Sequence, residues 1–445
     1  YFSQGKYNVK IETKVEELDQ NRVNIEIDIS EGIKSLIKQI NIIGNKVFDD
    51  DTLLDELQLG IPSGWNPFSS VDEYSKPKLQ ADLETIRSYY LDRGYIKFNV
   101  DSTQVSITPD NKDIYVTINV TESEKYTIKD VQLTGDMVIN KAVLEQLITT
   151  RPGDTFSRRM MTESQKALED RVGIIGYAFA KVSVLPEVNE EDRTISLIYT
   201  MKPGRKVYVR RITFFGNYKT NDEVLRREFR LMEGSVLASD KLERSKVRLQ
   251  RLSYMEQVEV ETRPVAGTDN QVDIDVTVTE RLSGSFNIGA GFSQAQGLLF
   301  NVGLTQENLL GTGQALSLNV NTDRANTVYS ASFTDPYYTV DGISRTISAS
   351  YRNRDAAQEE IAEYQSNSYG VNLSYGIPMS EVNTLRLGIG FNAIDLTVGV
   401  NPSLDVVEFI AKYGNKFDNF SLTASYSHDT RNRTVFATRG SAQTI

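Results

Sequence analysis

The sequence lacks cysteine altogether and has a single histidine, His428, among its 445 residues. The first absence excludes disulfide bonds, thiolate metal sites and cysteine nucleophiles, and the second excludes chemistry that needs two imidazoles. No run of 18 apolar residues occurs, so no transmembrane helix is predicted, although a barrel strand needs only about ten residues of alternating polarity. Acidic residues outnumber basic ones by 60 to 49, so nucleic acid is not expected as the main partner.

Charged residues are unevenly distributed, and the change falls near Leu282. They make up 85 of the first 282 residues but only 24 of the last 163, where Lys412 and Lys416 are the only lysines. Glycine changes in the opposite direction, with 14 in the first part and 15 in the shorter second part. This difference predicts two regions in different surroundings, one in water and one in a less polar medium.

The first region repeats an apolar segment that ends at Gly44, Gly135 and Gly216. Each copy is followed by Asn or Asp at a helix start, then a second helix with one apolar face, then two strands around a polar turn. Gly94 suits the left-handed residue after a helix, and we expect Ser253 to occupy that position in the last copy at some energetic cost. The pattern predicts a repeated β-α-α-β-β unit.

These repeats predict the domain boundaries. Residues 33–124, 125–204 and 205–282 each form one complete unit, and residues 1–32 correspond to the C-terminal part of a preceding unit. We therefore expect the chain to begin within a domain. Residues 283–445 form a domain of another kind.

Apolar and polar residues alternate throughout residues 283–445, which predicts eight strands and the beginning of a ninth near Arg439. The polar face consists of Ser, Thr, Asn and Gly, as in a transmembrane β-barrel with a wet interior. A soluble antiparallel sandwich also alternates and remains the alternative. Aromatic strand ends, short turns at 311–313 and 341–342, and long polar connections at 353–367 and 393–417 favour the barrel.

A sheet with two free edges cannot persist in lipid, because every backbone polar group there needs a partner. We therefore expect either further strands after Ile445 or pairing with another chain.

Several motifs resemble the Omp85 superfamily. Glu280–Gly289 is similar to the passage from the last periplasmic POTRA domain into the first barrel strand, and Asn308–Gly313 and Asp335–Gly342 resemble the family's hairpins. Leu91–Tyr95 and Val224–Glu228 resemble the enterobacterial members. The resemblance implies α+β POTRA repeats (the end of the second, then the third to fifth) followed by roughly the first half of a sixteen-stranded barrel.

The resemblance also implies a function. The protein is expected to be a Gram-negative outer-membrane assembly factor with its POTRA domains in the periplasm. It would receive unfolded β-barrel clients and insert them into the membrane by strand templating and local bilayer thinning. No cofactor, metal or catalytic residue is expected. The implied partners are unfolded outer-membrane proteins, lipoproteins such as BamD, and outer-membrane lipid, with periplasmic chaperones as a further candidate.

Two other functions fit part of the pattern. A two-partner-secretion pore of the same superfamily would translocate one extended polypeptide, but such pores resemble this chain with two repeats rather than three and part of a fourth. A passive porin or receptor with periplasmic domains is the alternative from a different class.

Free strand edges carry the strongest prediction of a site, because they recruit extended chains through main-chain hydrogen bonds. The first is the strand Lys97–Ile107, unless neighbouring domains or helices cover it. The second is the strand Gly284–Ser293, whose glycines lower the cost of separating a strand pair, unless they merely fit a crowded lumen. The candidate residues are Lys97, Phe98, Val100, Ser102 and Val105 in the first strand, and Gly284, Ser285, Phe286, Asn287, Ile288, Gly289 and Gly291 in the second.

The resemblance further implies that Glu228 and Arg227 belong to the docking surface for the partner lipoprotein. Without it, Glu228 would be interpreted as an ordinary surface residue. The basic pairs 205–206 and 210–211 are candidates for anionic lipid head groups, although a solvated strand face explains them better.

Two acidic segments have simpler interpretations than catalysis or metal binding. Asp49–Asp51 precedes a helix and is expected to cap it rather than to bind calcium. His428 lies between Ser427 and Asp429 at a strand end, and we expect it to be a rim residue rather than part of a catalytic triad.

Overall fold

The computed structural model describes residues 1, 5–6, 9–18, 22–32, 34–61, 71–294, 297–359, 363–432 and 437–445. The chain divides into two compact units, residues 1–173 with 177–204, and residues 174–176 with 205–445. Each unit is described by itself. Within the described residues, no helix combines the length and apolar character required to cross a bilayer.

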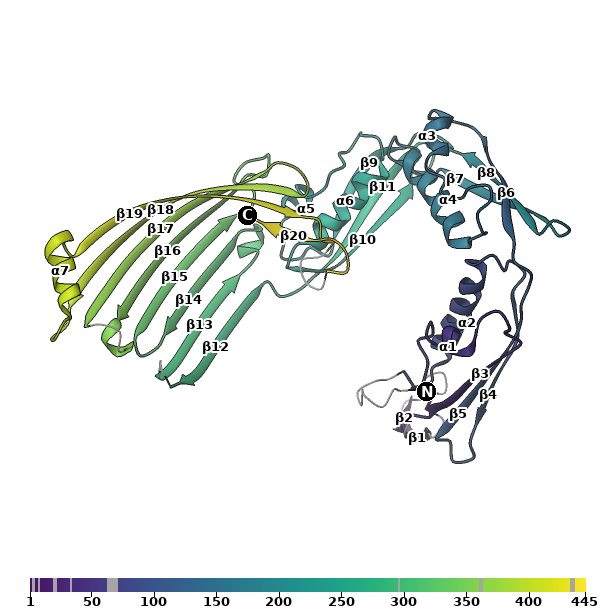
Figure 1. The fold of residues 1–445 in the computed structure, drawn as a ribbon, viewed down its shortest axis with the longest axis horizontal. Coiled ribbons are helices and arrows are strands. Elements are labelled where there is room, and N and C mark those ends of the chain that lie inside the picture. The colour runs from purple at the N-terminus through teal and green to yellow at the C-terminus, as the bar shows by residue number, and fades with distance from the viewer. Residues whose placement is uncertain are drawn as a thin grey trace. The chain divides into compact units, whose positions relative to one another are not determined.

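The first unit begins with an antiparallel hairpin and continues with two copies of the predicted β-α-α-β-β unit (Figure 1). The hairpin consists of β1 (Lys10–Leu18) and β2 (Arg22–Ser30). The first copy comprises β3 (Leu36–Ile43), α1 (Asp50–Leu54), α2 (Lys76–Leu91), β4 (Asn99–Ile107) and β5 (Asp113–Thr121). The second comprises β6 (Thr127–Gly135), α3 (Lys141–Glu145), α4 (Arg158–Gly173), β7 (Lys181–Asn189) and β8 (Thr194–Lys202).

The second unit contains the third copy of the repeat. It comprises β9 (Tyr208–Phe215), α5 (Asp222–Arg226), α6 (Ser239–Gln250), β10 (Met255–Pro264) and β11 (Gln271–Glu280). In all three copies the last strand lies in the middle of the sheet, parallel to the first strand and antiparallel to the other. The predicted repeat is therefore confirmed.

The middle strand carries the core of each repeat. In β5, Ile114, Val116 and Ile118 are fully buried, and α2 packs Ile86 and Tyr90 into the same cluster. Tyr90 stacks on Phe98 with the ring centroids 4.0 Å apart, and its hydroxyl donates to Glu122 Oε1 at 2.6 Å. The predicted apolar helix face is thus the face that covers the sheet.

Two local predictions at helix ends have different outcomes. Asp49 caps α1 by accepting a hydrogen bond from Thr52 N–H at 2.9 Å, as predicted. Ser253 does not have the positive φ that was expected of it, whereas Gly94 has φ +98°. From the C-cap Arg251 of α6 the chain reaches β10 at Met255 without any residue of positive φ.

The rest of the second unit is one antiparallel sheet in which each strand pairs with the next along the chain (Figure 1). Its strands are β12 (Gly284–Ser293), β13 (Gly297–Gln306), β14 (Ala315–Thr322), β15 (Asn326–Asp335), β16 (Ser344–Asp355), β17 (Tyr364–Pro378), β18 (Asn383–Val398), β19 (Lys416–Asp429) and β20 (Ala442–Thr444). Two short 3-10 helices, η2 (Leu309–Gly311) and η3 (Ala356–Glu359), lie in its connections. The predicted strands of an incomplete barrel are confirmed.

The connections differ from the prediction. Strand β17 already begins at Tyr364, and the 393–417 segment holds the end of β18 and a helix, α7 (Leu404–Tyr413). The first two connections at the far end, 294–296 and 323–325, are shorter than the turns 307–314 and 336–343 next to the last repeat. Both of these turns contact the repeat, as described below.

Candidate functional site: open sheet edges and a charged junction

The first barrel strand is an edge of the sheet. Among the described residues β12 pairs only with β13, in an unbroken register from Gly284 opposite Gln306 to Ser293 opposite Gly297. An edge strand presents one row of backbone N–H and C=O groups without a partner in the sheet. In the described part of the barrel β12 is the first strand, and its role as a template stays a prediction.

The glycines of β12 have different surroundings. A Cβ on Gly289 would lie 2.3 Å from Asn301 Oδ1 on the opposite strand, so crowding on the polar face explains this glycine. A Cβ on Gly291 would meet Leu299 Cδ1 at an ordinary 3.7 Å. Crowding therefore does not require glycine at position 291. At that position the alternative interpretation still holds, namely that glycine lowers the cost of separating the strand pair.

Each repeat sheet has two edge strands, and the antiparallel edges β4, β7 and β10 differ in how well they are protected. Strand β4 has neither proline nor charge from Ser102 to Ile107. Strand β7 is interrupted by Pro186, which has no N–H to donate, and β10 carries Glu256, Glu259, Glu261 and Arg263. Prolines and charges discourage pairing at a sheet edge. Of the three strands, β4 is the least protected.

Two of the residues predicted for the β4 edge are engaged elsewhere. Phe98 is 3% exposed and belongs to the core of its repeat, so its side chain is not available to a client. The Lys97 ammonium pairs with Glu190 at 2.6 Å, in the turn between β7 and β8. The part of the edge left open to a partner therefore begins at Asn99.

The last repeat contacts the two barrel turns next to it, 307–314 and 336–343. Asn308 Nδ2 donates to Thr220 Oγ1 at 2.8 Å, and the Asn221 N–H donates to the Gly311 carbonyl at 2.9 Å. Asn221 is the N-cap residue of α5, but its side chain makes no capping bond. Its backbone N–H binds the turn instead.

A charged cluster forms the second part of this junction. Arg248 on α6 donates to Glu228 Oε2 at 2.6 Å, to the Tyr337 hydroxyl at 2.9 Å and to Glu381 Oε2 at 2.9 Å. Arg230 donates to the other oxygen of Glu381 at 2.8 Å, and the Arg227 guanidinium lies 4.5 Å from the centre of the Tyr337 ring. We call these six residues the junction cluster.

The junction cluster is partly desolvated. Burial disfavours the charge of Arg248, but the neighbouring Glu228, Tyr337 and Glu381 more than compensate and raise its pKa. Burial likewise opposes ionisation of Glu381, yet Arg230 and Arg248 hold the pKa of this carboxyl below its ordinary value. Both groups are therefore kept charged by each other.

Glu228, predicted to dock a lipoprotein, is not an ordinary surface residue. It is 7% exposed and paired with Arg248, and Arg227 stacks on a barrel turn. Docking at Glu228 stays a prediction, and it would require the pair with Arg248 to open. Sequence reasoning missed Arg248, Tyr337 and Glu381, because no local pattern connects residues that lie 20 to 153 positions from Glu228.

Two of the four basic candidates at 205–206 and 210–211, and His428, have local partners. Arg205 pairs with Asp269 at 2.7 Å, and Arg210 Nε donates to Asp273 Oδ1 at 2.7 Å, so neither is a free cation. His428 Nδ1 lies 2.7 Å from Asn383 Oδ1 on the neighbouring strand. Within the described part of the chain, no three acidic or histidine side chains are grouped in a way that could hold a metal ion.

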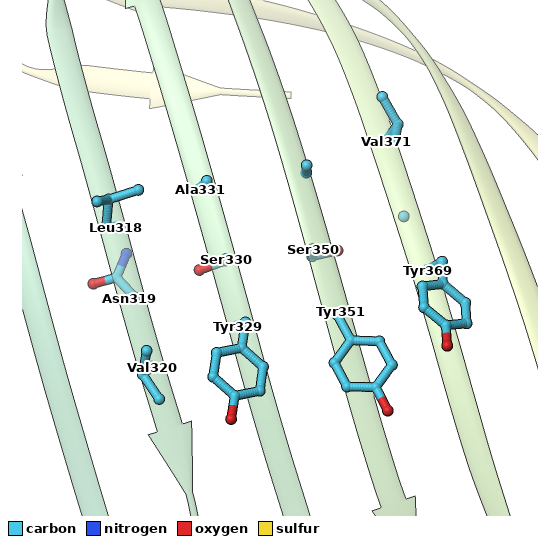
Figure 2. Close-up of a pocket in the computed structure, with 12 residues that line it drawn as sticks. Leu318, Asn319, Val320, Tyr329, Ser330, Ala331, Ser350, Tyr351, Tyr369 and Val371 are labelled. Atoms are coloured by element: carbon cyan, nitrogen blue, oxygen red, sulfur yellow. The ribbon is translucent and has the colours of Figure 1, made fainter.

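The barrel sheet has a polar face, which carries Ser, Thr, Asn and Gly, and an apolar face on its other side. Tyr329, Tyr351 and Tyr369 form one row across three strands with their hydroxyls directed to the same end, as Figure 2 shows. Next to them Ala331 and Ala349 leave a shallow recess of about 500 Å³. A row of tyrosines beside an apolar band is typical of the lipid-facing wall of an outer-membrane barrel.

Comparison with known families agrees with this architecture. The POTRA family model, described as a surface antigen variable number repeat, matches residues 35–123, 126–204 and 207–281, and the Omp85 superfamily domain matches residues 308–445. Together the three POTRA matches cover more than half of the chain.

Individual relatives agree as well. The chain is 33% identical over 417 residues to the outer membrane protein assembly factor BamA of Neisseria meningitidis, covering 93% of this chain and 52% of that protein. It is 28% identical over 371 residues to BamA of Buchnera aphidicola, covering 83% and 60%. The chain thus spans about half the length of these curated relatives.

Solved structures give the same result. BamA of Haemophilus ducreyi lacking POTRA domains 1–3 has a TM-score of 0.57 and 32% identity, covering 72% of this chain and 63% of that one. The POTRA3-5 fragment of Haemophilus influenzae BamA has a TM-score of 0.50 and 28% identity, covering 55% and 96%. The chain therefore belongs to the BamA-type members of the Omp85 superfamily, outer-membrane proteins with periplasmic POTRA domains and a membrane β-barrel.

Proposed function

We propose that the protein is an outer-membrane assembly factor that receives unfolded β-barrel clients in the periplasm and inserts them into the outer membrane by strand templating. The observation that carries the proposal is a barrel sheet, beginning with β12, that is joined directly to three POTRA repeats. The names of the relatives, assembly factors in several bacteria, support the same function.

The proposed mechanism uses backbone groups rather than reactive side chains. A client segment first pairs with β4 from Asn99 onward. Its strands then add at β12, as β12 separates from the closing strand of the full-length barrel. Main-chain pairing depends little on sequence, so one machine can serve many clients. No catalytic residue, cofactor or metal takes part in the proposed process.

The proposal includes a partner at the junction. A lipoprotein of the BamD type would dock at the C-terminal end of α5, where Arg227 and Glu228 follow the helix, and periplasmic chaperones would deliver clients. The position of both residues in the junction cluster supports a docking event that also alters the contacts between the last repeat and the barrel.

Depletion of the full-length protein in its host tests the proposed function. We expect the levels of many outer-membrane barrels to fall together, measured by quantitative proteomics of outer-membrane fractions. Loss of one secreted substrate with normal barrels would indicate a two-partner-secretion pore instead. Normal assembly of all barrels would indicate a passive porin or receptor.

A further inference from the structure

A recess lies where the chain leaves the last repeat and enters the barrel. Its volume is about 330 Å³, and its lining includes Lys219, Arg281, Ser283, Gln306 and Leu310. These residues come from the loop before α5, the linker to β12, and the end of β13 with the turn 307–314 that follows it. We call it the linker recess.

The linker recess offers positive charge. Among the described residues, neither the Lys219 ammonium nor the Arg281 guanidinium belongs to an ion pair, and Arg281 Nε donates only to the Ser253 carbonyl. One carboxylate, Glu280, also lines the recess, but it already accepts hydrogen bonds from the Lys219 and Thr220 backbones and from the Thr220 hydroxyl. The remaining N–H donors of both cations can bind an anion.

One large apolar residue lines the recess, and two more directly adjoin its cations in the sequence. Tyr218 is 95% exposed, Leu282 83% and Leu310 89%, and each adjoins or lines the recess from a different segment. Leu310 has φ +52°, a left-handed conformation that costs free energy for a leucine. Three exposed apolar side chains beside two unpaired cations do not suit a surface that faces only water.

The recess is continuous with the membrane-facing wall of the barrel. Gln306 lies opposite Gly284, and the next outward-facing pair along these strands is Phe286 opposite Leu304. Both of these side chains are exposed on the apolar face, Phe286 at 64% and Leu304 at 42%. The recess therefore begins where the lipid-facing surface ends on the side of the repeats.

We propose that the linker recess binds a glycerophospholipid of the adjoining membrane leaflet. Lys219 and Arg281 bind its phosphate, while Leu310, Leu282 and Phe286 contact its acyl chains. The proposal rests on the membrane location of the barrel and not on the proposed assembly activity. Because the lipid would contact the first residues of β12, its binding would also affect the position of that strand.

The test measures lipid retained by the full-length protein after reconstitution with phosphatidylethanolamine and extraction into detergent, by native mass spectrometry. We expect one bound lipid in the unmodified protein and about tenfold less in a Lys219→Gln, Arg281→Gln double variant, since charge-assisted contacts are lost. Leu310→Gly should give a similar loss while folding at least as well, because glycine adopts φ +52° without strain.

Lys46→Gln is the matched control. Lys46 occupies the same place in the first complete repeat, where its N–H donates to Glu122 as that of Lys219 does to Glu280, but that repeat is followed in the chain by another repeat and not by barrel strands. Retention by the test variants equal to that of the control would overturn the proposal. So would a loss in the double variant without one in Leu310→Gly, because a small free anion would behave in that way.

Discussion

Arg248 is the residue on which the contact between the last repeat and the barrel most depends. It binds two carboxylates and a phenol and is itself only 23% exposed in its side chain. Removing one partner of a desolvated charge network leaves the others unpaired, which costs more than the network contributes. The matched comparison is Arg244 on the same helix, which pairs with Asp240 and has a side chain that is 58% exposed.

We predict that Arg248→Ala weakens the junction by about 2–3 kcal/mol, because charge-assisted hydrogen bonds are lost in a partly buried site. Arg244→Ala should cost less than about 0.5 kcal/mol, since surface pairs contribute little. Hydrogen exchange of the turn 336–343 in the full-length protein measures the difference. Equal protection in the two variants would show that the cluster does not hold the turn.

The junction should also respond to acid. The pKa of Glu381 lies below the ordinary 4.5, so its carboxylate stabilises the junction fully above that value. The contribution is lost as the pH falls through the lowered pKa and the carboxyl takes up a proton. We expect protease protection of the turn 379–382 to decline below pH 4.5. The Glu381→Gln variant should start with less protection and lose the corresponding part of the pH dependence.

At the scale of the elements, two glycines of similar φ allow the cost of backbone strain to be compared with the cost of crowding around an added Cβ. Gly94 and Gly153 have nearly the same positive φ, +98° and +93°. A Cβ on Gly94 would lie 2.8 Å from Thr155 Cγ2 and 2.9 Å from the Tyr126 carbonyl, whereas a Cβ on Gly153 would meet nothing within 4 Å. The turn after α2 is thus packed against the next repeat within the first unit.

We therefore predict that Gly94→Ala destabilises its repeat by about 1–3 kcal/mol more than Gly153→Ala does, because overpacking adds to the shared cost of a positive φ. Chemical denaturation of both variants gives the difference. A difference below about 0.5 kcal/mol would mean that the neighbouring repeat moves away at little cost.

The proposed role of β4 leads to a prediction of the same kind. A lysine on an edge strand opposes pairing with another chain, so Gln104→Lys should reduce client crosslinking to β4 several-fold. Ser183→Lys on the proline-interrupted strand β7 is the control and should leave it unchanged. Both positions are exposed, so neither variant should lose more than about 0.5 kcal/mol of stability. Equal crosslinking in both variants would exclude β4 as the receiving edge.

For the whole molecule, the proposed mechanism requires β12 to separate from its barrel neighbour. A disulfide from Ser285→Cys to a cysteine on the closing strand of the full-length protein should stop barrel assembly under oxidising conditions. Reduction should restore it, and the single Ser285→Cys variant should assemble barrels normally. Porin levels in the outer membrane provide the measurement. Normal porin assembly with the bond formed would exclude templating at β12.

The sequence was sufficient for the local elements. The repeats, the apolar helix face with Ile86 and Tyr90, and the alternating strands from Gly284 onward follow from periodicities of 3.6 and 2, which neighbouring residues express by themselves. The Asp49 cap was predictable for the same reason. The family followed from motifs such as Glu280–Gly289, because those motifs are contiguous.

Only the tertiary structure decided which surfaces remain free. Phe98, predicted to lie at the β4 edge, proved to be core because its ring stacks on Tyr90. The junction cluster joins Arg248 to Glu381 across 133 positions, and the linker recess gathers three segments into one surface. Burial and pairing of this kind depend on distances between segments remote in the chain, and a local pattern does not contain those distances.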